Sequence, residues 1–273
     1  MGVRHSFFAP DEQALAEEFL AQGYVIRPVD DREALDELRA MVAGLACEFL
    51  GLSFPNDVGD FLNHIERAVP IERLNELRLA TYRKMNAVPW FRPTYFALAR
   101  SGLEKLVGNE LAMQNRVNLS IQLPQDDSSL LPIHADAFGG ETPFQVVEWL
   151  PLVDCHGTKS MFILPRPANE RALAAFTRYQ GRGMDTLFDD VKDELVWLDV
   201  PYGSVLIFSP NQLHGGAVNT EPETRWSMNC RITGLFTPYR GAEKKLGSYY
   251  LPITTRPVTE IGIAYKEPSG FSE

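Results

Sequence analysis

The sequence predicts a mainly β fold with a helical N-terminal third and flanking helices, in which the strands form an antiparallel barrel or jelly roll. Residues 1–110 repeat their apolar side chains at helical spacing. From Arg116, short runs rich in Val, Ile, Phe and Trp alternate with Gly and Pro turns. With no internal repeat or low-complexity linker, 273 residues suit a single domain. We divide it into a helical support region (1–110), a jelly-roll core (111–240) and a C-terminal segment (241–273) that wraps the barrel.

The helical third has recognisable start and stop signals. Pro10 opens a helix through Leu20, Gly23 ends it, and residues 23–29 follow as a short strand. Asp30 or Asp31 then caps a second helix with one apolar face. That face consists of Leu35, Leu38, Val42, Leu45 and Phe49. Residues 51–70 have the composition of a loop, and two more helices are expected near residues 71–86 and 94–107.

Eight short strands are expected in the second part of the chain. They cover residues 116–123, 133–136, 143–150, 159–164, 194–200, 204–209, 215–219 and 225–236. Between the fourth and the fifth lie a polar, helix-like insert (168–180) and an acidic stretch (185–194) that is expected to be a solvated loop.

Composition limits the functional classes. Hydrophobic residues make up 45% of the chain and charged residues 23%, and no stretch is long and apolar enough to cross a bilayer. The first twenty residues turn acidic directly after a short apolar patch, which is not typical of a signal peptide. Three scattered cysteines favour a reducing, cytoplasmic setting over a disulfide scaffold. A net charge of −10 argues against a nucleic-acid partner.

The residues that indicate chemistry are His134, Asp136 and His214. Residues at positions i and i+2 of a strand point to the same face, so His134 and Asp136 can enter one cavity. Two imidazoles and one carboxylate can bind one face of Fe(II) and leave the opposite face open. Alone the pattern is weak, because a surface turn ending in two glycines could also contain His-x-Asp.

The strand that begins at Arg225 alternates between polar and apolar side chains. Arg225, Ser227, Asn229 and Arg231 share one face, and the other face is continuously apolar. If the polar face looks inward, Arg225 needs an anionic partner, because an unpaired buried charge is costly. A carboxylate of 2-oxoglutarate would be such a partner. The alternative is that this face lies on the surface.

In these motifs the chain resembles the non-heme Fe(II)/2-oxoglutarate-dependent dioxygenases, whose pattern is His-x-Asp, a distal His and then Arg-x-Ser. The resemblance implies a double-stranded β-helix, a cupin-like jelly roll. It also implies that His134, Asp136 and His214 bind Fe(II), that Arg225 and Ser227 hold the far carboxylate of 2-oxoglutarate, and that O2 is consumed. Related halogenases have a small residue at the position of Asp136, so chloride ligation is not expected.

A closer likeness covers roughly residues 115–255. The segments around Pro143, Trp149 and Lys159 are similar to oxygenases of sporadic bacterial carbohydrate (surface-polysaccharide) clusters, and distantly to the phytanoyl-CoA hydroxylase branch. The likeness implies hydroxylation of a sugar, a nucleotide-linked sugar or a glycan precursor. Family members often add a polar co-substrate contact from an early strand, for which Asn118 and Gln122 are the candidates; ordinary cross-strand hydrogen bonding is the alternative.

Other interpretations remain open. The same chemistry could act on an amino acid or an acyl thioester. A non-catalytic cupin-like module could bind a metal or a sugar, and a cupin enzyme could use a metal without 2-oxoglutarate. We expect His156 to lie in a turn, Cys155 to be no nucleophile, and Lys159, Arg166 and Arg231 to form a solvated rim.

Overall fold

The computed structural model describes residues 6–128, 130–241 and 243–270. Residues 1–5, on which the expectation of no signal peptide partly rests, lie outside this part of the chain. Within the described part, no helix combines the length and the hydrophobicity that crossing a bilayer requires.

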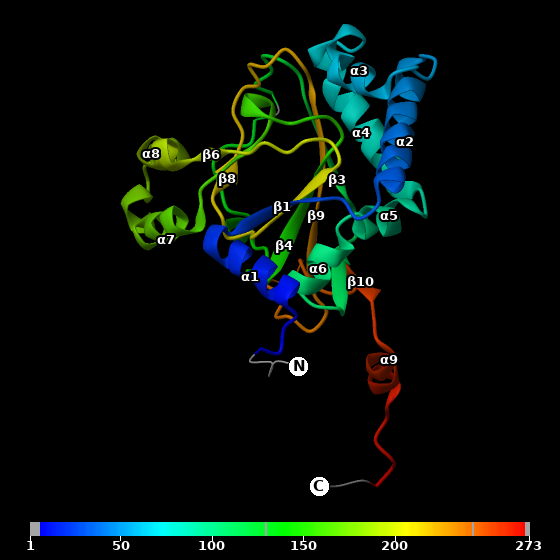
Figure 1. Cartoon of the computed structure of the whole chain (residues 1–273), viewed down its shortest axis with the longest axis vertical. Coiled ribbons are helices and arrows are strands. Elements are labelled where there is room, and N and C mark those ends of the chain that lie inside the picture. The colour runs from blue at the N-terminus through cyan, green and yellow to red at the C-terminus, as the bar shows by residue number, and fades with distance from the viewer. Residues whose placement is uncertain (1–5, 129, 242, 271–273) are drawn as a thin grey trace.

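Antiparallel strands form two sheets, as the sequence predicts (Figure 1). The larger sheet has the order β1-β7-β4-β9-β2-β10, with β3 also paired to β9, and the smaller has the order β6-β5-β8. The strands of the larger sheet are β1 (Tyr24–Pro28), β2 (Leu111–Gln114), β3 (Asn118–Gln122), β4 (Gln145–Pro151), β7 (Ser204–Phe208), β9 (Arg225–Gly234) and β10 (Tyr250–Thr254). Those of the smaller are β5 (Phe162–Ile163), β6 (Val196–Trp197) and β8 (His214–Gly215).

Helices of the N-terminal third cover one side of the larger sheet (Figure 1). They are α1 (Pro10–Gln22), α2 (Arg32–Leu50), α3 (Val58–Asn63), α4 (Ile71–Ala87), α5 (Phe91–Ala97) and α6 (Arg100–Leu106). Local chemistry explains their ends: the Asp31 side chain accepts a hydrogen bond from the amide of Ala34 at the start of α2, and Gly23 adopts φ 84° after α1.

Two predictions for this region were wrong in detail. Residues 51–70 contain α3 and a short 3-10 helix, because Asp57 caps the turn and Leu62 and Ile65 are buried. The single helix expected near residues 94–107 is two helices, α5 and α6. The Asp30 carboxylate accepts hydrogen bonds from the amide and hydroxyl of Ser101, in the first turn of α6.

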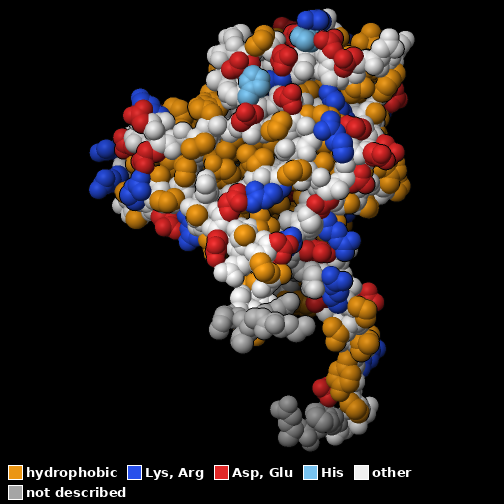
Figure 2. All heavy atoms as spheres, viewed as in Figure 1, with side chains coloured by type: hydrophobic (Ala, Val, Ile, Leu, Met, Phe, Trp, Pro, Cys, Tyr) orange, Lys and Arg blue, Asp and Glu red, His pale blue; other side chains and the backbone are white. Residues whose placement is uncertain are grey.

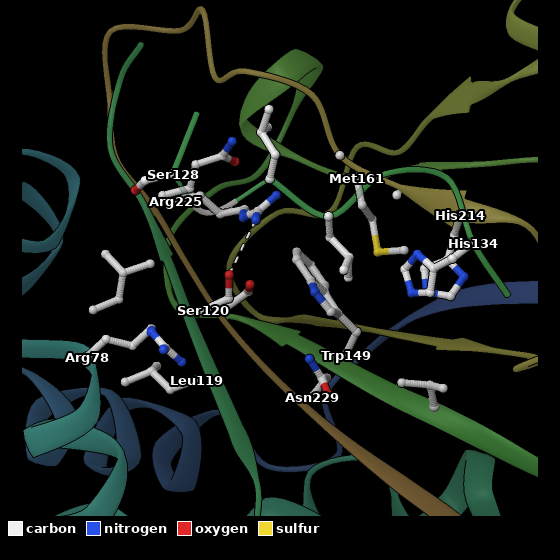
Figure 3. Close-up of a pocket in the computed structure, with 18 of the residues that line it drawn as sticks. Arg78, Leu119, Ser120, Ser128, His134, Trp149, Met161, His214, Arg225 and Asn229 are labelled. Atoms are coloured by element: carbon white, nitrogen blue, oxygen red, sulfur yellow. Dashed lines mark hydrogen bonds between the residues drawn. The ribbon is translucent and has the colours of Figure 1, made fainter. Parts of the chain in front are cut away.

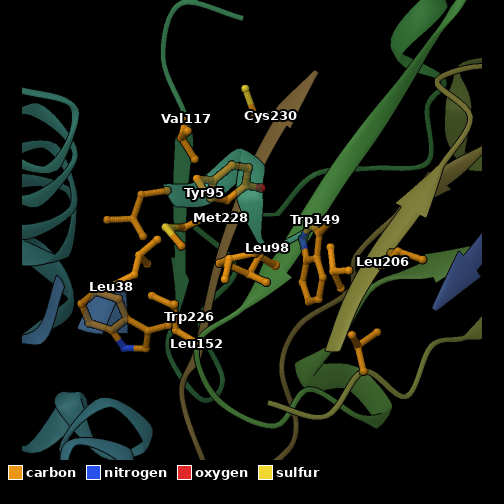
Figure 4. Close-up of a cluster of buried hydrophobic side chains, with 14 of the residues drawn as sticks. Leu38, Tyr95, Leu98, Val117, Trp149, Leu152, Leu206, Trp226, Met228 and Cys230 are labelled. Carbon is orange, nitrogen blue, oxygen red and sulfur yellow. The ribbon is translucent and has the colours of Figure 1, made fainter. Parts of the chain in front are cut away.

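The core lies between these helices and β9. The odd-even alternation of β9 holds: Trp226, Met228 and Cys230 are fully buried among helix residues such as Leu38 and Tyr95 (Figure 4). Burying each large apolar side chain stabilises the fold by roughly 1.5–3 kcal/mol. The opposite face of β9, which carries Arg225 and Arg231, is therefore held toward the space between the two sheets.

A second, smaller core lies on the outer side of the smaller sheet, under α7 (Arg166–Ala174) and α8 (Met184–Val191). The polar insert is helical, as expected. The acidic stretch is not a loop but mostly α8, because Leu187 and Val191 point inward and are buried.

The C-terminal segment was expected to wrap the barrel, and its first part, up to residue 254, packs against it. Residues 250–254 pair with β2 as the edge strand β10, which sequence reasoning missed. The next helix, α9 (Pro257–Ala264), has no buried residue and projects from the body (Figure 1). Its apolar side chains, among them Val258, Ile261 and Ile263, gather on the projecting arm in Figure 2. Because none of its residues is buried, hydrophobic packing against the rest of the protein does not fix the position of α9.

The core also contains an acidic group without a hydrogen-bond partner in the described structure. Glu148 is fully buried on β4, and neither carboxyl oxygen has a hydrogen-bond partner there. Burial, and then the charge of Asp30, raise the pKa of this carboxyl well above its usual value. The folded protein therefore holds a proton that the unfolded chain releases, so stability falls as pH rises above the unfolded pKa of about 4.3.

We expect Glu148→Gln to raise the melting temperature more at pH 7.5 than at pH 5, because the amide stays neutral at both. Each pH unit between the unfolded and the folded pKa costs the wild type about 1.4 kcal/mol. Differential scanning calorimetry at the two pH values measures the effect, with the exposed Glu37→Gln as the matched control. An equal effect of Glu148→Gln at both pH values would contradict the assignment.

Candidate metal centre

A cavity of about 590 Å³ lies between the two sheets and reaches α4. Its size is in the range of sites that bind small molecules. Residues of β3, β4, β7 and β9 line it from the larger sheet, and residues next to β5 and β8 from the smaller. Figure 3 shows the two histidines at one end of this cavity and Arg225 between them and α4.

His134, Asp136 and His214 meet at that end. One ligand atom from each lies within 4.8 Å of the others, and the two imidazole centroids are 4.3 Å apart. The strand expected at residues 133–136 is reduced to one bridge, in which His134 and His214 exchange two backbone hydrogen bonds of 2.9 and 2.8 Å. A 3-10 helix begins at Asp136, but Ala135 is extended (φ −117°, ψ 135°), so residues 134 and 136 still point the same way.

Glycine permits the close backbone approach at the bridge. A Cβ atom on Gly215 would lie 2.9 Å from the carbonyl oxygen of Leu131 and 2.9 Å from the Phe162 ring. A side chain at this position would therefore push β8 away from residues 131–133 and separate the two histidines.

Backbone carbonyls orient both imidazoles. The Nδ1 atom of His134 lies 2.8 Å from the carbonyl oxygen of Pro132, and that of His214 lies 2.8 Å from the carbonyl oxygen of Gln212. A carbonyl only accepts, so each Nδ1 carries a proton and Nε2 is the ring nitrogen left to bind a metal. Burial, and next the charge of His134, lower the pKa of His214 to about 4, so this ring is neutral at physiological pH.

Arg231 holds the carboxylate in place. Its Nη2 and Nε atoms donate to the two oxygens of Asp136 at 2.8 and 3.1 Å, and both side chains are largely buried. Burial alone would raise the pKa of Asp136, but the contact with His134 and the charge of Arg231 bring it well below its usual value. The expectation that Arg231 lies on a solvated rim was wrong, because the cavity-facing side of β9 is covered by the 3-10 helix that carries Asp136.

A buried network extends from Arg231 to the C-terminal segment. Glu141, 2% exposed, lies 3.6 Å from the Arg231 guanidinium. Its carboxylate accepts hydrogen bonds from Lys244 Nζ at 2.7 Å, from the Tyr250 hydroxyl at 2.5 Å and from the Tyr249 hydroxyl at 3.1 Å. Residues of β10 and the loop before it thus compensate a buried charge next to the triad.

Arg225 is a half-buried cation with neutral partners. Its Nη1 donates to the Ser160 carbonyl at 3.0 Å and its Nη2 to the Ser120 hydroxyl at 3.3 Å. Among the described residues, Arg225 Nε, Ser227 Oγ, Ser160 Oγ and Gln122 Oε1 are buried without a hydrogen-bond partner. Burial lowers the pKa of Arg225 from its usual value. Arg225 Nε and the two serine hydroxyls can donate, which fits a bound carboxylate, whereas Gln122 Oε1 can only accept.

The two arginines of the cavity-facing side of β9 therefore differ. Arg231 is occupied by Asp136, whereas Arg225 is free to take an anion. Gln122 lines the cavity and donates to the Ala217 carbonyl at 2.8 Å. Asn118 is not among the lining residues and donates to the Asn229 side chain at 2.9 Å, which is the cross-strand alternative. Ser120, two positions along, contacts Arg225 and was missed, although it shares a face with Asn118 and Gln122.

The remaining candidates lie elsewhere. Lys159 was wrongly expected on a rim: its side chain is fully buried, and its Nζ binds Asn63 and Glu223 at 2.7 and 2.6 Å. Arg166 is partly exposed and pairs with Glu170. His156 is exposed. Burial raises the pKa of the Cys155 thiol to about 12, so no thiolate nucleophile forms.

Solved structures share this architecture. The non-heme monooxygenase ThoJ, in complex with nickel, matches with a TM-score of 0.57 and 15% identity over 90% of this chain and 85% of its own. SnoK, a non-heme α-ketoglutarate-dependent carbocyclase from nogalamycin biosynthesis, matches with a TM-score of 0.54 and 15% identity over 91% of this chain and 97% of its own. EctD from S. alaskensis, with 2-oxoglutarate and 5-hydroxyectoine, matches with a TM-score of 0.53 and 16% identity over 85% of this chain and 80% of its own.

The fold is that of these non-heme oxygenases. The comparison confirms the jelly-roll fold that the sequence predicts. No protein-family model and no curated protein matches the sequence.

We expect Arg231→Met to weaken Ni²⁺ or Co²⁺ binding by about 10- to 100-fold, because the carboxylate loses the partner that orients it. Isothermal titration calorimetry measures this affinity. Arg231→Lys should retain part of it. Arg240→Met is the matched control, because Arg240 is exposed and its side chain donates a hydrogen bond to the Ala137 carbonyl and to no carboxylate of the described residues. Equal affinities of wild type and Arg231→Met would show that Arg231 does not position Asp136.

Proposed function

We propose that the protein is an Fe(II)- and 2-oxoglutarate-dependent oxygenase, an oxidoreductase that hydroxylates a small molecule. One observation carries the proposal. A His-Asp-His triad, with Asp136 and His214 buried and His134 half-buried, faces the same cavity as the half-buried guanidinium of Arg225, which has no acidic partner among the described residues. The triad offers a metal site, and the guanidinium offers the anchor that a dicarboxylic co-substrate needs.

His134, Asp136 and His214 would hold the metal. Two neutral nitrogens and one carboxylate oxygen are the donor set that suits Fe(II) in oxygenases. Bound iron would supply the activation of O2, coupled to conversion of 2-oxoglutarate into succinate and CO2. Arg231 would keep Asp136 ionised and oriented throughout.

Arg225 would bind the distal carboxylate of 2-oxoglutarate. Its unpaired Nε and the hydroxyl of Ser227 would donate to that carboxylate, and Gln122 and Ser120 would complete the polar lining. Such charge-assisted hydrogen bonds are strong in a buried site. Apolar side chains, among them Trp149, Met161 and Phe208, line the rest of this region and would exclude water.

For the substrate, the sequence supports a sugar, a nucleotide-linked sugar or a glycan precursor, with an amino acid or an acyl thioester as the alternative. The whole cavity, at about 590 Å³, is in the size range of sites that bind small molecules. A cytoplasmic location is part of the proposal, supported by three buried cysteines without a disulfide in the described structure.

We expect Ni²⁺-loaded wild type to bind 2-oxoglutarate, and Arg225→Met to weaken this binding by about 10- to 100-fold, because a charged hydrogen-bond partner is lost. Titration calorimetry measures both. The Fe(II)-loaded wild type should also show a weak visible charge-transfer band with 2-oxoglutarate under anaerobic conditions and release succinate in air. His134→Ala should lose metal binding, and Arg240→Met should match the wild type.

A metal-loaded wild type that neither binds 2-oxoglutarate nor shows the band would overturn the proposed function. Binding without any succinate release, with every substrate class named above present, would instead indicate a non-catalytic metal-binding module.

A further inference from the structure

The cavity continues past Arg225 to the first turns of α4. Ile71, Leu74, Asn75 and Arg78 line it there. Figure 3 shows the Arg78 guanidinium directed into the cavity beside Leu119, at the end opposite to the two histidines. The proposed metal and co-substrate thus leave a region between Arg225 and α4 that they do not use.

Charge in this region is unbalanced. The ionisable lining residues besides the histidines are Asp136, Arg78, Arg225 and Arg231. Asp136 pairs with Arg231, and 2-oxoglutarate would take Arg225. Arg78 donates to the amide oxygen of Asn75 at 2.6 Å, a neutral partner, and no carboxylate of the described residues forms an ion pair with it. One guanidinium therefore faces the cavity without an anion.

The hydrogen bond also orients Asn75. Because its oxygen accepts from Arg78, its NH₂ group is left to donate to a ligand. An anion in front of α4 would meet a guanidinium and an amide donor three residues apart on one helical face, which is a suitable arrangement for a carboxylate or phosphate oxygen.

Apolar side chains line the same cavity as this polar pair. Leu74 and Leu119 are buried, whereas Ile71, Leu130 and Leu131 are 45%, 37% and 57% exposed at the cavity's rim. Large apolar residues exposed together beside a cavity indicate a ligand-contact surface. The ligand should therefore have an apolar portion next to its charged group.

We propose that the substrate carries an anionic group, a carboxylate or a phosphate, that binds Arg78 and Asn75, and an apolar portion that contacts the leucines of the rim. This inference rests on the proposed function, because it assigns Arg225 to 2-oxoglutarate. It favours a nucleotide-linked sugar, an amino acid or an acyl thioester over a neutral sugar.

The test uses full-length protein loaded with Ni²⁺ and saturating 2-oxoglutarate, so that no turnover occurs. Hexanoate, hexyl phosphate and hexanol are titrated calorimetrically as anionic and neutral probes of equal chain length. We expect at least one anionic probe to bind about tenfold or more tightly than hexanol. Arg78→Gln should remove this preference, and Arg78→Lys should keep part of it. Arg83→Gln, at an exposed arginine of the same helix outside the cavity lining, should keep it fully.

The probes also separate the two charged groups, because a preference for hexyl phosphate over hexanoate identifies a phosphate substrate and the reverse a carboxylate. Anionic probes that bind no better than hexanol, including no binding by any probe, would overturn the inference. So would an Arg78→Gln variant that loses 2-oxoglutarate affinity as severely as Arg225→Met, since Arg78 would then serve the co-substrate. Either result leaves the proposed function intact, because that function is tested separately by 2-oxoglutarate binding and succinate release of the wild type.

Discussion

The ion pair between Asp136 and Arg231 is the interaction on which the candidate site depends. A carboxylate that is 8% exposed beside two imidazoles needs compensation, and a bidentate guanidinium provides it. A buried pair of this kind adds little net stability, because desolvating two charges costs about as much as their attraction returns. Its value is geometric: it fixes the one anionic side chain of the triad before any ion arrives.

Much of this site can be predicted from the alternation of side chains along the strands and from the spacing of the polar residues. The alternation along β9 correctly puts Arg225, Ser227 and Arg231 on one side and the core residues on the other, because a ten-residue strand has no freedom to change faces. The approach of His134 to His214 required the family resemblance, since nothing local links two positions that belong to different strands. Their proximity in the structure agrees with that expectation.

What spacing could not reveal is which partner each polar side chain meets. The sequence predicts that Arg231 and Lys159 lie on the solvated rim of the barrel. Both side chains are largely buried instead, because segments distant in sequence cover them. Two short elements were not predicted for a related reason. The helix α3 has six residues and the strand β10 has five, which is too few for a periodic pattern of apolar side chains to be recognised. The strand β10 also depends on a distant partner, because it forms by pairing with the edge of β2. The helix α9 shows the opposite case, an apolar pattern that finds no surface to cover.

The network around Glu141 has a consequence for how the protein is made. Lys244 and Tyr250 follow Glu141 by 103 and 109 residues, so their hydrogen bonds to its carboxylate cannot exist until translation has passed residue 250. The three triad residues and Arg231 all precede residue 244 in the chain. The hydrogen bonds that compensate the buried charge of Glu141 are therefore completed last, when the final strand of the larger sheet docks on β2.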